Sequence, residues 1–311
     1  MGTSTQAGAG TFAALSHELA TVVDRAGKSV VAIDARPRVP TSGILWRPSL
    51  VVATDHTIRR EEEISVTLPD GRAVPAKIAG RDSTTDLAVL KLDESGGESA
   101  VTGAGENISV GNLVLAVGRA KGNHLVTSLG IASSVSGEWQ TWRGGKVDRF
   151  VRLDLSIFIG FSGSALVNAS GGIAGINTTG LARGLGVTIP VSTVNRVVDE
   201  LVAKGHIARG YIGIATQPVI LPERLSTKLN LANQSGLIIV TVEPDGPADK
   251  AGMMIGDILV SLDGAPASDI GDIQAKLGSE FIGRSIAASV LRGGALVPFT
   301  LGISERPSRI R

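Results

Sequence analysis

The sequence contains no cysteine in its 311 residues. The chain therefore forms no disulfide bond, no thiolate zinc site and no cysteine nucleophile, and this absence leaves its redox compartment open. No apolar run approaches the roughly 18 residues that a membrane-spanning helix needs. The first ten residues are small and polar, so they lack the apolar centre of an export signal.

The sequence also lacks an excess of either charge, because its 30 lysine and arginine residues are balanced by 29 aspartate and glutamate residues. Such a chain has no bulk field that attracts nucleic acid or an anionic membrane, so we predict no nucleic-acid partner. We also predict no cofactor and no metal. Hydrophobic residues make up 43% of the chain and glycine occupies 40 positions, which is typical of a globular chain with many short strands and tight turns. The length predicts two or three domains.

Short β-branched runs, separated by glycine, proline and aspartate, fill the chain from residue 30 to about residue 185. This spacing favours antiparallel strands in barrels or a sandwich over βαβ units. The predicted strands are residues 30–35, 50–54, 64–68, 74–78, 87–92, 113–117 and 173–176.

Two helices are predicted around these strands. Apolar residues at helical spacing predict an amphipathic helix at residues 12–24, after a disordered tail at residues 1–11. A second helix is expected from Pro190 to Lys204, with Ser192 as its N-cap and Gly205 just past its end. The predicted domain boundary lies at residues 205–209, and a small domain of mixed strands and helices follows.

The turn Gly160-Phe161-Ser162-Gly163 is the first candidate site. A serine between glycines on a tight turn exposes its hydroxyl, and the same turn aims backbone N–H groups at one point. These are the two requirements of an acyl-transfer nucleophile. Such turns are common, and most are structural. The catalytic interpretation of Ser162 therefore requires a base and a carboxylate elsewhere in the chain.

Two residues can supply these groups. His56 follows the predicted strand 50–54, and Asp86 precedes the predicted strand 87–92. Taken singly, His56 is typical of a surface or capping histidine, and Asp86 is typical of a turn aspartate. The order His56, Asp86, Ser162 is that of chymotrypsin-like proteases and differs from the orders in subtilisin and in α/β-hydrolases.

With these residues the sequence resembles the HtrA/Deg family of trypsin-like serine proteases with one C-terminal PDZ domain. The family's Thr-Asn-His-Val-Val is matched by residues 54–58, its Thr-Asp-Leu-Ala-Val-Leu-Lys by residues 85–91, and its Gly-Asn-Ser-Gly-Gly-Pro-Leu-Val-Asn by residues 160–168. The resemblance implies a mostly β fold. A chymotrypsin-like double β-barrel protease domain at residues 12–205 would precede a small α+β PDZ domain at residues 210–304.

The resemblance also implies a function, that of a serine endopeptidase that hydrolyses peptide bonds of unfolded or damaged proteins. Ser162 would attack the peptide carbonyl, His56 would accept and return the proton, and Asp86 would orient the imidazole. The backbone N–H groups of Gly160 and Ser162 would form the oxyanion hole.

Specificity is expected from the residues just before this turn. Ser156 and Ile157 would line the specificity pocket. No carboxylate lies between Leu155 and Ser162. We therefore predict small or medium apolar side chains at the P1 position of the substrate, rather than lysine or arginine.

The nucleophile turn departs from the family's pattern. Phe161 replaces asparagine and Ser164 replaces glycine, so a large ring and a backbone-restricting β-carbon lie beside Ser162. The alternative function is therefore a catalytically weak or inactive, peptide-binding or chaperone-like member. Trp139 and Trp142 lie in a loop that is either an exposed hairpin or, by resemblance, a regulatory loop acting on the oxyanion turn.

The C-terminal domain carries a second candidate site. Tyr211-Ile212-Gly213-Ile214 matches the carboxylate-binding loop of PDZ domains, where backbone N–H groups would receive the terminal carboxylate of a peptide. Ile273 and Leu277 of a predicted helix at residues 269–277 would form an apolar wall of this groove. Their other interpretation is ordinary core.

The resemblance implies partners and a location as well. Unfolded polypeptides would be substrates, C-terminal peptides would bind the PDZ domain, and the chain would form a homotrimer through its N-terminal segment. The expected location is the periplasm or the cell envelope. A cytoplasmic location is the alternative, since the chain has no export signal or transmembrane segment.

Overall fold

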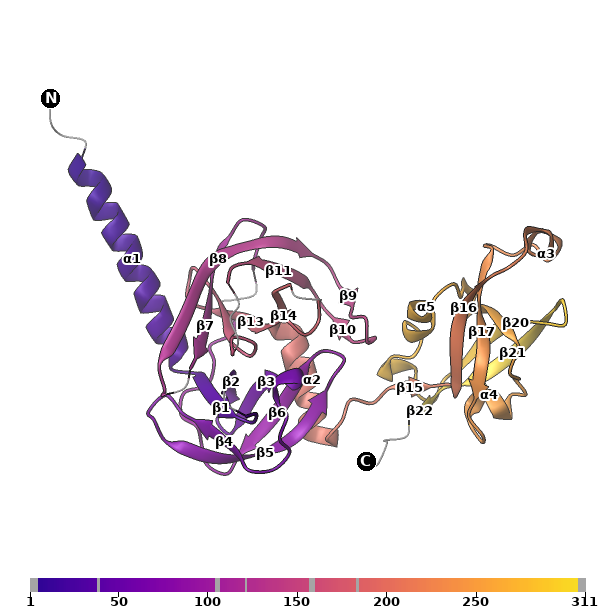
Figure 1. Cartoon of the computed structure of the whole chain (residues 1–311), viewed down its shortest axis with the longest axis horizontal. Coiled ribbons are helices and arrows are strands. Elements are labelled where there is room, and N and C mark those ends of the chain that lie inside the picture. Colours follow the sequence, from indigo (N-terminus) through magenta and orange to yellow (C-terminus); the bar gives the residue numbers. More distant parts are fainter. Residues whose placement is uncertain are drawn as a thin grey trace. The chain divides into compact units, whose positions relative to one another are not determined.

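Two compact units make up the chain, Met1–Ile207 and Ala208–Arg311. The structure is a computed structural model that describes residues 5–37, 40–103, 107–120, 122–156, 160–182 and 185–306, with only the backbone for residues 5–9. The division between the units falls inside the stretch 205–209. Figure 1 shows the strand-rich first unit with helices α1 and α2, and the smaller second unit.

The first barrel is a closed antiparallel sheet in the order β1-β2-β3-β6-β5-β4. Its interior is filled by fully buried residues such as Val31, Ile33 and Leu90, because alternate residues of each strand face inward. A turn at Pro69-Asp70-Gly71 joins β4 to β5, with Gly71 at a positive φ of 90°. The strands are β1 (Val30–Asp34), β2 (Thr41–Arg47), β3 (Leu50–Thr54), β4 (Ile64–Thr67), β5 (Ala73–Asp82) and β6 (Leu87–Leu92).

The second barrel is also a closed antiparallel sheet, in the order β11-β14-β13-β12-β7-β8. Val114, Ala132 and Leu166 belong to its interior cluster. A separate hairpin of β9 and β10 lies between β8 and β11 in the chain. The strands are β7 (Leu113–Arg119), β8 (Leu125–Ser136), β9 (Trp139–Gln140), β10 (Lys146–Val147), β11 (Phe150–Asp154), β12 (Ala165–Asn168), β13 (Ile173–Thr178) and β14 (Val187–Pro190).

A third apolar cluster joins the two barrels to each other and to both helices. The helix α2 (Val191–Lys204) buries Val194 and Leu201 in it, and Gly205 ends this helix in the left-handed conformation at φ 77°. The helix α1 (Thr5–Gly27) contributes Val22 near its C-terminal end. Its preceding turns are exposed, and Phe12 is 75% exposed.

Arg119 is a buried polar link between the barrels. It lies at the end of β7, is 6% exposed, and donates hydrogen bonds of 2.6 Å to the carbonyls of Val30 in β1 and Gly27 in α1. Burial lowers the pKa of the guanidinium from its usual value. Because a buried donor must be satisfied, these backbone acceptors hold β7, β1 and the end of α1 together.

Two sequence predictions about the helices need correction. The helix α1 starts at Thr5 rather than at residue 12, so part of the expected tail is helical. The early residues are glycine, alanine and polar residues, which give no apolar periodicity to detect. Ser192 is not the N-cap of α2, because the helix begins at Val191 and Pro190 occupies the cap position without a side-chain hydrogen bond.

The second unit is a sheet in the order β16-β17-β18-β20-β21 with short helices. Asp257 is 2% exposed and accepts 2.7 Å hydrogen bonds from Arg292 on both carboxylate oxygens, which lowers the pKa of Asp257. The elements are β15 (Gly210–Tyr211), β16 (Ile214–Ile220), α3 (Glu223–Lys228), β17 (Ser235–Val242), α4 (Pro247–Lys250), β18 (Ile258–Leu262), β19 (Ala265–Pro266), α5 (Ile270–Gln274), β20 (Ser285–Arg292), β21 (Ala295–Gly302) and β22 (Ser304–Glu305).

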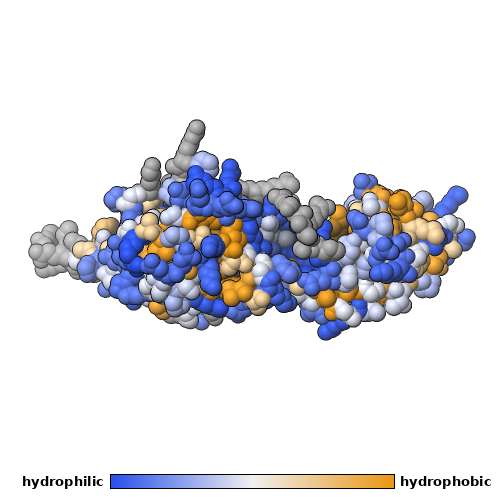
Figure 2. Space-filling model, turned by 90° about the horizontal axis from the view of Figure 1, so that it is seen from below, coloured by the Kyte–Doolittle hydropathy of each residue, from blue (hydrophilic) through white to orange (hydrophobic). Residues whose placement is uncertain are grey.

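The visible face of the molecule is mostly polar, and apolar patches interrupt it on both units (Figure 2). Among the described helices, none is long and apolar enough to cross a membrane.

Candidate active site

His56 and Asp86 form a hydrogen-bonded pair at one end of the first barrel. His56 lies in a 3₁₀ turn, η1 (Asp55–Thr57), directly after β3, and Asp86 directly precedes β6. These two strands are neighbours, with Thr54 opposite Leu87, so their ends bring the two side chains together. The His56 Nδ1 atom lies 2.8 Å from Oδ2 and 3.0 Å from Oδ1 of Asp86, and the His56 backbone N–H donates to Oδ1 at 2.9 Å.

The Asp86 carboxylate is buried and has several hydrogen-bond partners. Its side chain is 3% exposed, whereas that of His56 is 35% exposed. The Thr178 hydroxyl, at the end of β13 in the second barrel, donates a further hydrogen bond to Asp86 Oδ2. Hydrogen bonds to the charged form stabilise a buried carboxylate. Asp86 Oδ2 therefore contacts both the His56 imidazole and a residue of the second barrel.

Ser162 lies in the turn that precedes β12 of the second barrel, and it is 6% exposed. Its Oγ lies 3.3 Å from Oγ1 of Thr179, the residue after Thr178. Among the described residues no hydrogen bond joins Ser162 to His56. Its backbone carbonyl accepts a 2.8 Å hydrogen bond from the buried Thr41 hydroxyl of β2, which fixes the turn against the first barrel.

The strand end Thr178–Gly180 connects the three candidate residues. A β-carbon at Gly180 would lie 2.6 Å from Asp86 Oδ2 and 2.8 Å from His56 Nδ1, so the glycine backbone packs directly against the pair. Its neighbour Thr179 contacts Ser162. The strand end Thr178–Gly180 therefore touches all three residues predicted from the sequence.

The turn around Ser162 depends on close approach to β2. Gly163 has a φ of 92°, and a side chain there would collide with the carbonyl of Ser42. The Ser42 N–H and hydroxyl both donate to the carbonyl of Gly160, at 3.2 and 3.1 Å. Since Gly160 itself has a φ of 99°, both glycines of the turn occupy conformations that other residues rarely adopt.

Two departures from the family's pattern are accommodated in this turn. Phe161 is 3% exposed, so its ring is buried rather than displayed at the site. The fully buried Ser164 has no positive φ, and its Oγ accepts a 3.0 Å hydrogen bond from Asn177, which in turn accepts from Thr188 at 2.8 Å. The β-carbon and the hydroxyl of Ser164 therefore cost little here, because the backbone is ordinary and the polar group is paired.

The hairpin of β9 and β10 is attached to the turn that carries Asp86. The buried Thr141 hydroxyl donates to the Thr84 carbonyl at 2.7 Å, and Gly145 packs so closely on Thr84 that a side chain would not fit. On the other side of this turn, Asp82 accepts from Thr84. Asp86 itself adopts a φ of 58°, a left-handed conformation that aspartate tolerates. The hairpin is therefore bonded to the aspartate turn, and its tip exposes 67% of Trp142.

Of the two residues predicted for the specificity pocket, the structure describes only Ser156. Ser156 is exposed at the end of the stretch 150–156. Ile157, like Phe158 and Ile159, lies outside the described residues. Among the described residues, no group of three or more histidine, aspartate or glutamate side chains is arranged to hold a metal.

In the second unit, the predicted carboxylate loop lies between β15 and β16. Gly213 has a φ of 80°, and the carbonyls of Ile212 and Gly213 accept hydrogen bonds from Ala248 and Glu243 at 2.9 and 2.8 Å. Burial, and then the nearby Glu243 carboxylate, raises the pKa of Tyr211, so its hydroxyl stays protonated at neutral pH.

The predicted apolar wall of this groove is only partly exposed. The helix α5 ends at Gln274 rather than at residue 277, and Asp269 and Asp272 form a capping box at its start. Ile273 is 6% exposed and belongs to the core of the second unit. Leu277 and Ile214 are half-buried against the same core, so part of each apolar side chain is accessible to a peptide.

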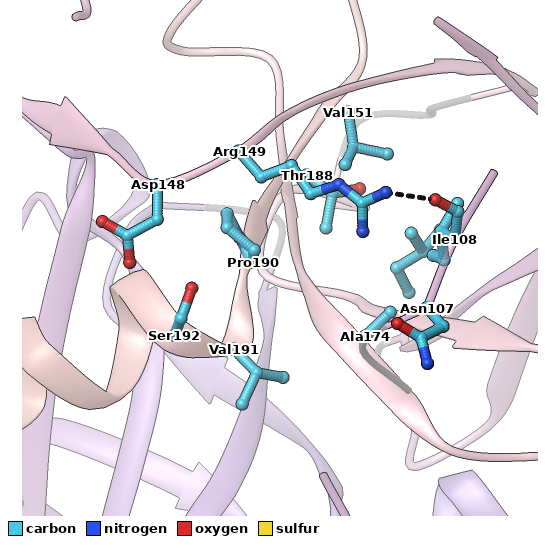
Figure 3. A pocket seen from close by; sticks show the side chains of 11 residues that line it. Asn107, Ile108, Asp148, Arg149, Val151, Ala174, Thr188, Pro190, Val191 and Ser192 are labelled. Carbon is cyan, nitrogen blue, oxygen red and sulfur yellow. Dashed lines mark hydrogen bonds between the residues drawn. The ribbon is translucent and has the colours of Figure 1, made fainter. Parts of the chain in front are cut away.

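A cavity of about 260 Å³ lies at one end of the second barrel, beside the start of α2 (Figure 3). Arg149 extends along it and donates to the Ile108 carbonyl at 2.6 Å. Val151, Leu166 and Ala174 form its apolar wall, and no residue of the cluster around Ser162 lines it. The cavity is therefore separate from the candidate active site.

Three residues of the site were missed by sequence reasoning, namely Thr178, Thr179 and Gly180. A signal for them was present. A polar triplet follows the predicted apolar strand 173–176, just as His56 follows the strand 50–54.

Family models and known proteins match both units. A trypsin-like peptidase domain model matches residues 41–176, and a PDZ domain model matches residues 210–303. A probable periplasmic serine endoprotease, DegP-like, of Brucella suis is 32% identical over 281 residues, covering 88% of this chain and 54% of the relative. The serine protease Do-like HtrA of Lactobacillus helveticus is 34% identical, covering 81% and 65%. The chain thus spans about half the length of the DegP-like relative.

Solved structures match nearly end to end. The HtrA-type protease AlgW with a decapeptide has a TM-score of 0.72 and 27% identity, covering 93% of this chain and 98% of that chain. The serine endoprotease from Yersinia pestis has a TM-score of 0.71 and 29% identity, with the same coverage. The order of the barrels, the PDZ unit and these matches agree, and the chain belongs to the HtrA family of trypsin-like peptidases with a C-terminal PDZ domain.

Proposed function

We propose that this chain is a serine endopeptidase with His56, Asp86 and Ser162 as its catalytic triad. The observation that carries the proposal is the convergence of these residues on the strand end Thr178–Gly180, where a buried carboxylate bonds the imidazole. The relatives are named as serine endoproteases, which supports the same chemistry here.

The reaction follows from the donors and acceptors present. The Asp86 carboxylate holds the proton on His56 Nδ1, which leaves Nε2 as a base for the Ser162 hydroxyl. Ser162 Oγ attacks the peptide carbonyl, and His56 passes the proton to the leaving amine. The backbone N–H groups of Gly160 and Ser162 receive the oxyanion, and removal of one such donor typically slows catalysis by about 10²–10³.

The substrates we infer are unfolded polypeptides with small or medium apolar residues at P1. Support comes from the lack of a carboxylate in the stretch 155–162 that would pair with lysine or arginine. Ser156 and Ile157 are the residues proposed for this pocket. The catalytically weak alternative is not favoured, since the burial of Phe161 and the pairing of Ser164 remove two reasons for a distorted turn.

For the second unit we propose binding of peptide C-termini at the loop Tyr211–Ile214. The carbonyls of Ile212 and Gly213 accept hydrogen bonds from Ala248 and Glu243, which holds the loop in place, and its backbone N–H groups are the donors we propose for a carboxylate. The strand β16 is an edge of its sheet, so a peptide can add to it as a further strand. Ile214 and Leu277 would contact its apolar side chains, whereas Ile273 serves the core. The solved neighbour AlgW was determined with a decapeptide.

Assembly and location complete the proposal. Phe12 and Leu15 are exposed and lie three positions apart on α1, so they share one apolar face of the helix, and such an exposed apolar patch supports a homotrimer formed through α1. The relatives named as periplasmic support the periplasm or cell envelope as the location.

Substitution of Ser162 tests the activity. We expect Ser162→Ala to lower cleavage of unfolded casein by about 10⁴–10⁶, because the nucleophile is lost while binding remains. Wild-type protein should also react with a fluorophosphonate probe at this residue, and sequencing the casein products gives the P1 residues. Ser170→Ala, an exposed serine in the turn after β12, is the matched control and should match wild type. Equal cleavage by Ser162→Ala, or a wild type without cleavage or labelling, contradicts the proposal.

Amidation of a peptide tests the second unit. A peptide with a free C-terminal carboxylate should bind at least about tenfold more tightly than its amide, because charge-assisted hydrogen bonds contribute about 1.5–3 kcal/mol. Fluorescence anisotropy on the whole chain measures both affinities. Leu277→Glu should weaken binding, whereas Leu296→Glu, an exposed leucine on β21, should not. Equal affinity for acid and amide would exclude the loop as a carboxylate site.

Light scattering tests the assembly. The whole chain should have the mass of three copies, and the double substitution of Phe12 and Leu15 by glutamate should give monomers. Ser16→Glu, an exposed polar position on the same helix, should leave the mass unchanged. A monomeric wild type, or an unchanged mass for the double variant, argues against this interface.

A further inference from the structure

Thr179 is the side chain that touches the nucleophile. Its Oγ1 lies 3.3 Å from Ser162 Oγ, in a site where Ser162 is 6% exposed and Thr179 is half-buried. Within the described part of the chain, no hydrogen bond joins Ser162 Oγ to His56, and its side-chain partner is this threonine. The proposed reaction assigns Thr179 no task.

The position of Thr179 is fixed from both sides. The preceding Thr178 donates to the buried Asp86, and the following Gly180 donates its N–H to the Thr178 hydroxyl at 2.8 Å. The Gly180 backbone also packs against His56 and Asp86 so closely that a β-carbon would not fit. The backbone on both sides of Thr179 is therefore held against the imidazole–carboxylate pair, which places the Thr179 hydroxyl beside Ser162.

A hydrogen bond to Thr179 competes with the proton transfer to His56. A serine hydroxyl has one proton. If it is donated to Thr179, it is not aligned with His56 Nε2. If Ser162 instead accepts from Thr179, one of its oxygen lone pairs is engaged. In the first arrangement the bond must break before Ser162 attacks a carbonyl, whereas in the second the proton and one lone pair stay available, so the competition arises when Ser162 is the donor.

We propose that Thr179 is a positioning residue that holds the Ser162 hydroxyl in a resting orientation, away from His56, and so lowers the rate of acylation. This inference rests on the proposed peptidase function and adds a restraint on its nucleophile. A hydrogen bond between two uncharged groups shifts an equilibrium by about 2- to 10-fold, so we expect a change of this size in the acylation rate. The restraint therefore lowers the rate at which Ser162 is acylated, both by a small probe and by a bound peptide.

The test compares variants that differ in one hydroxyl. Thr179→Val keeps the shape and removes the hydroxyl, Thr179→Ala removes it with less bulk, and Thr179→Ser retains it. The rate constant for labelling by a small fluorophosphonate is measured on the whole chain, together with kcat and KM for a short chromogenic peptide. Tryptophan fluorescence and circular dichroism check the fold.

We expect Thr179→Val and Thr179→Ala to label about 2- to 10-fold faster than wild type, with a higher kcat and an unchanged KM. Thr179→Ser should match wild type. The pH midpoint of the labelling rate should not move, because the contacts of His56 with Asp86 are intact. Thr178→Val is the contrasting variant: it removes a hydrogen bond from Asp86, so it should slow labelling and shift that midpoint.

Damage to the structure would slow labelling, so an increase identifies a released restraint. Rates for Thr179→Val and Thr179→Ala at or below that of wild type overturn the inference. So does a Thr179→Ser variant as fast as Thr179→Val, since the effect would then come from the methyl group. A wild type as unreactive as Ser162→Ala would instead refute the peptidase proposal itself, and the inference with it.

Discussion

The buried carboxylate of Asp86 is the constraint on which the protease domain depends. It lies at a turn of the first barrel, yet it is hydrogen-bonded to the backbone N–H and to Nδ1 of His56 and to the hydroxyl of Thr178 in the second barrel. A buried charge is stable only when its oxygens are satisfied. The barrels must therefore meet at this point, and their relative position is also the geometry of the site.

A second set of contacts holds the nucleophile turn to the same junction. β2 of the first barrel supplies the Thr41 hydroxyl to the Ser162 carbonyl and the Ser42 donors to the Gly160 carbonyl. Gly163 permits the close approach, because any side chain there would meet the Ser42 carbonyl. The first barrel thus contributes both the His56–Asp86 pair and the support of the turn that carries Ser162, although Ser162 itself belongs to the second barrel.

Much of this arrangement follows from the sequence, and the missing parts have physical reasons. The strands β3 and β6 were predicted with their observed bounds, because both are continuous apolar runs between polar residues. The strand β8 was not predicted, since its residues alternate between half-buried and exposed and include four serines. Ile273 was an open choice between groove and core, and burial, which periodicity does not reveal, places it in the core.

The candidate triad could be predicted from chain order, whereas the strand end that organises it was marked only by its polar residues, which do not say what they contact. Thr178 and Gly180 act through space, across the boundary between two barrels, and neither stands in a recognisable motif. Ser192 shows the converse error, because a good capping residue lies one position inside the helix and Pro190 takes the cap. Local preference suggests where an element can begin, and tertiary contacts decide where it does.

The most direct test of this account is the proton that joins His56 Nδ1 to Asp86, observed by proton NMR of the whole chain in water. The account predicts one strongly downfield resonance in the wild type that is absent from His56→Ala and from Asp86→Ala. A wild-type spectrum without that resonance at any pH where the protein is folded, or with one that persists in both variants, would contradict the claim that this buried pair organises the site.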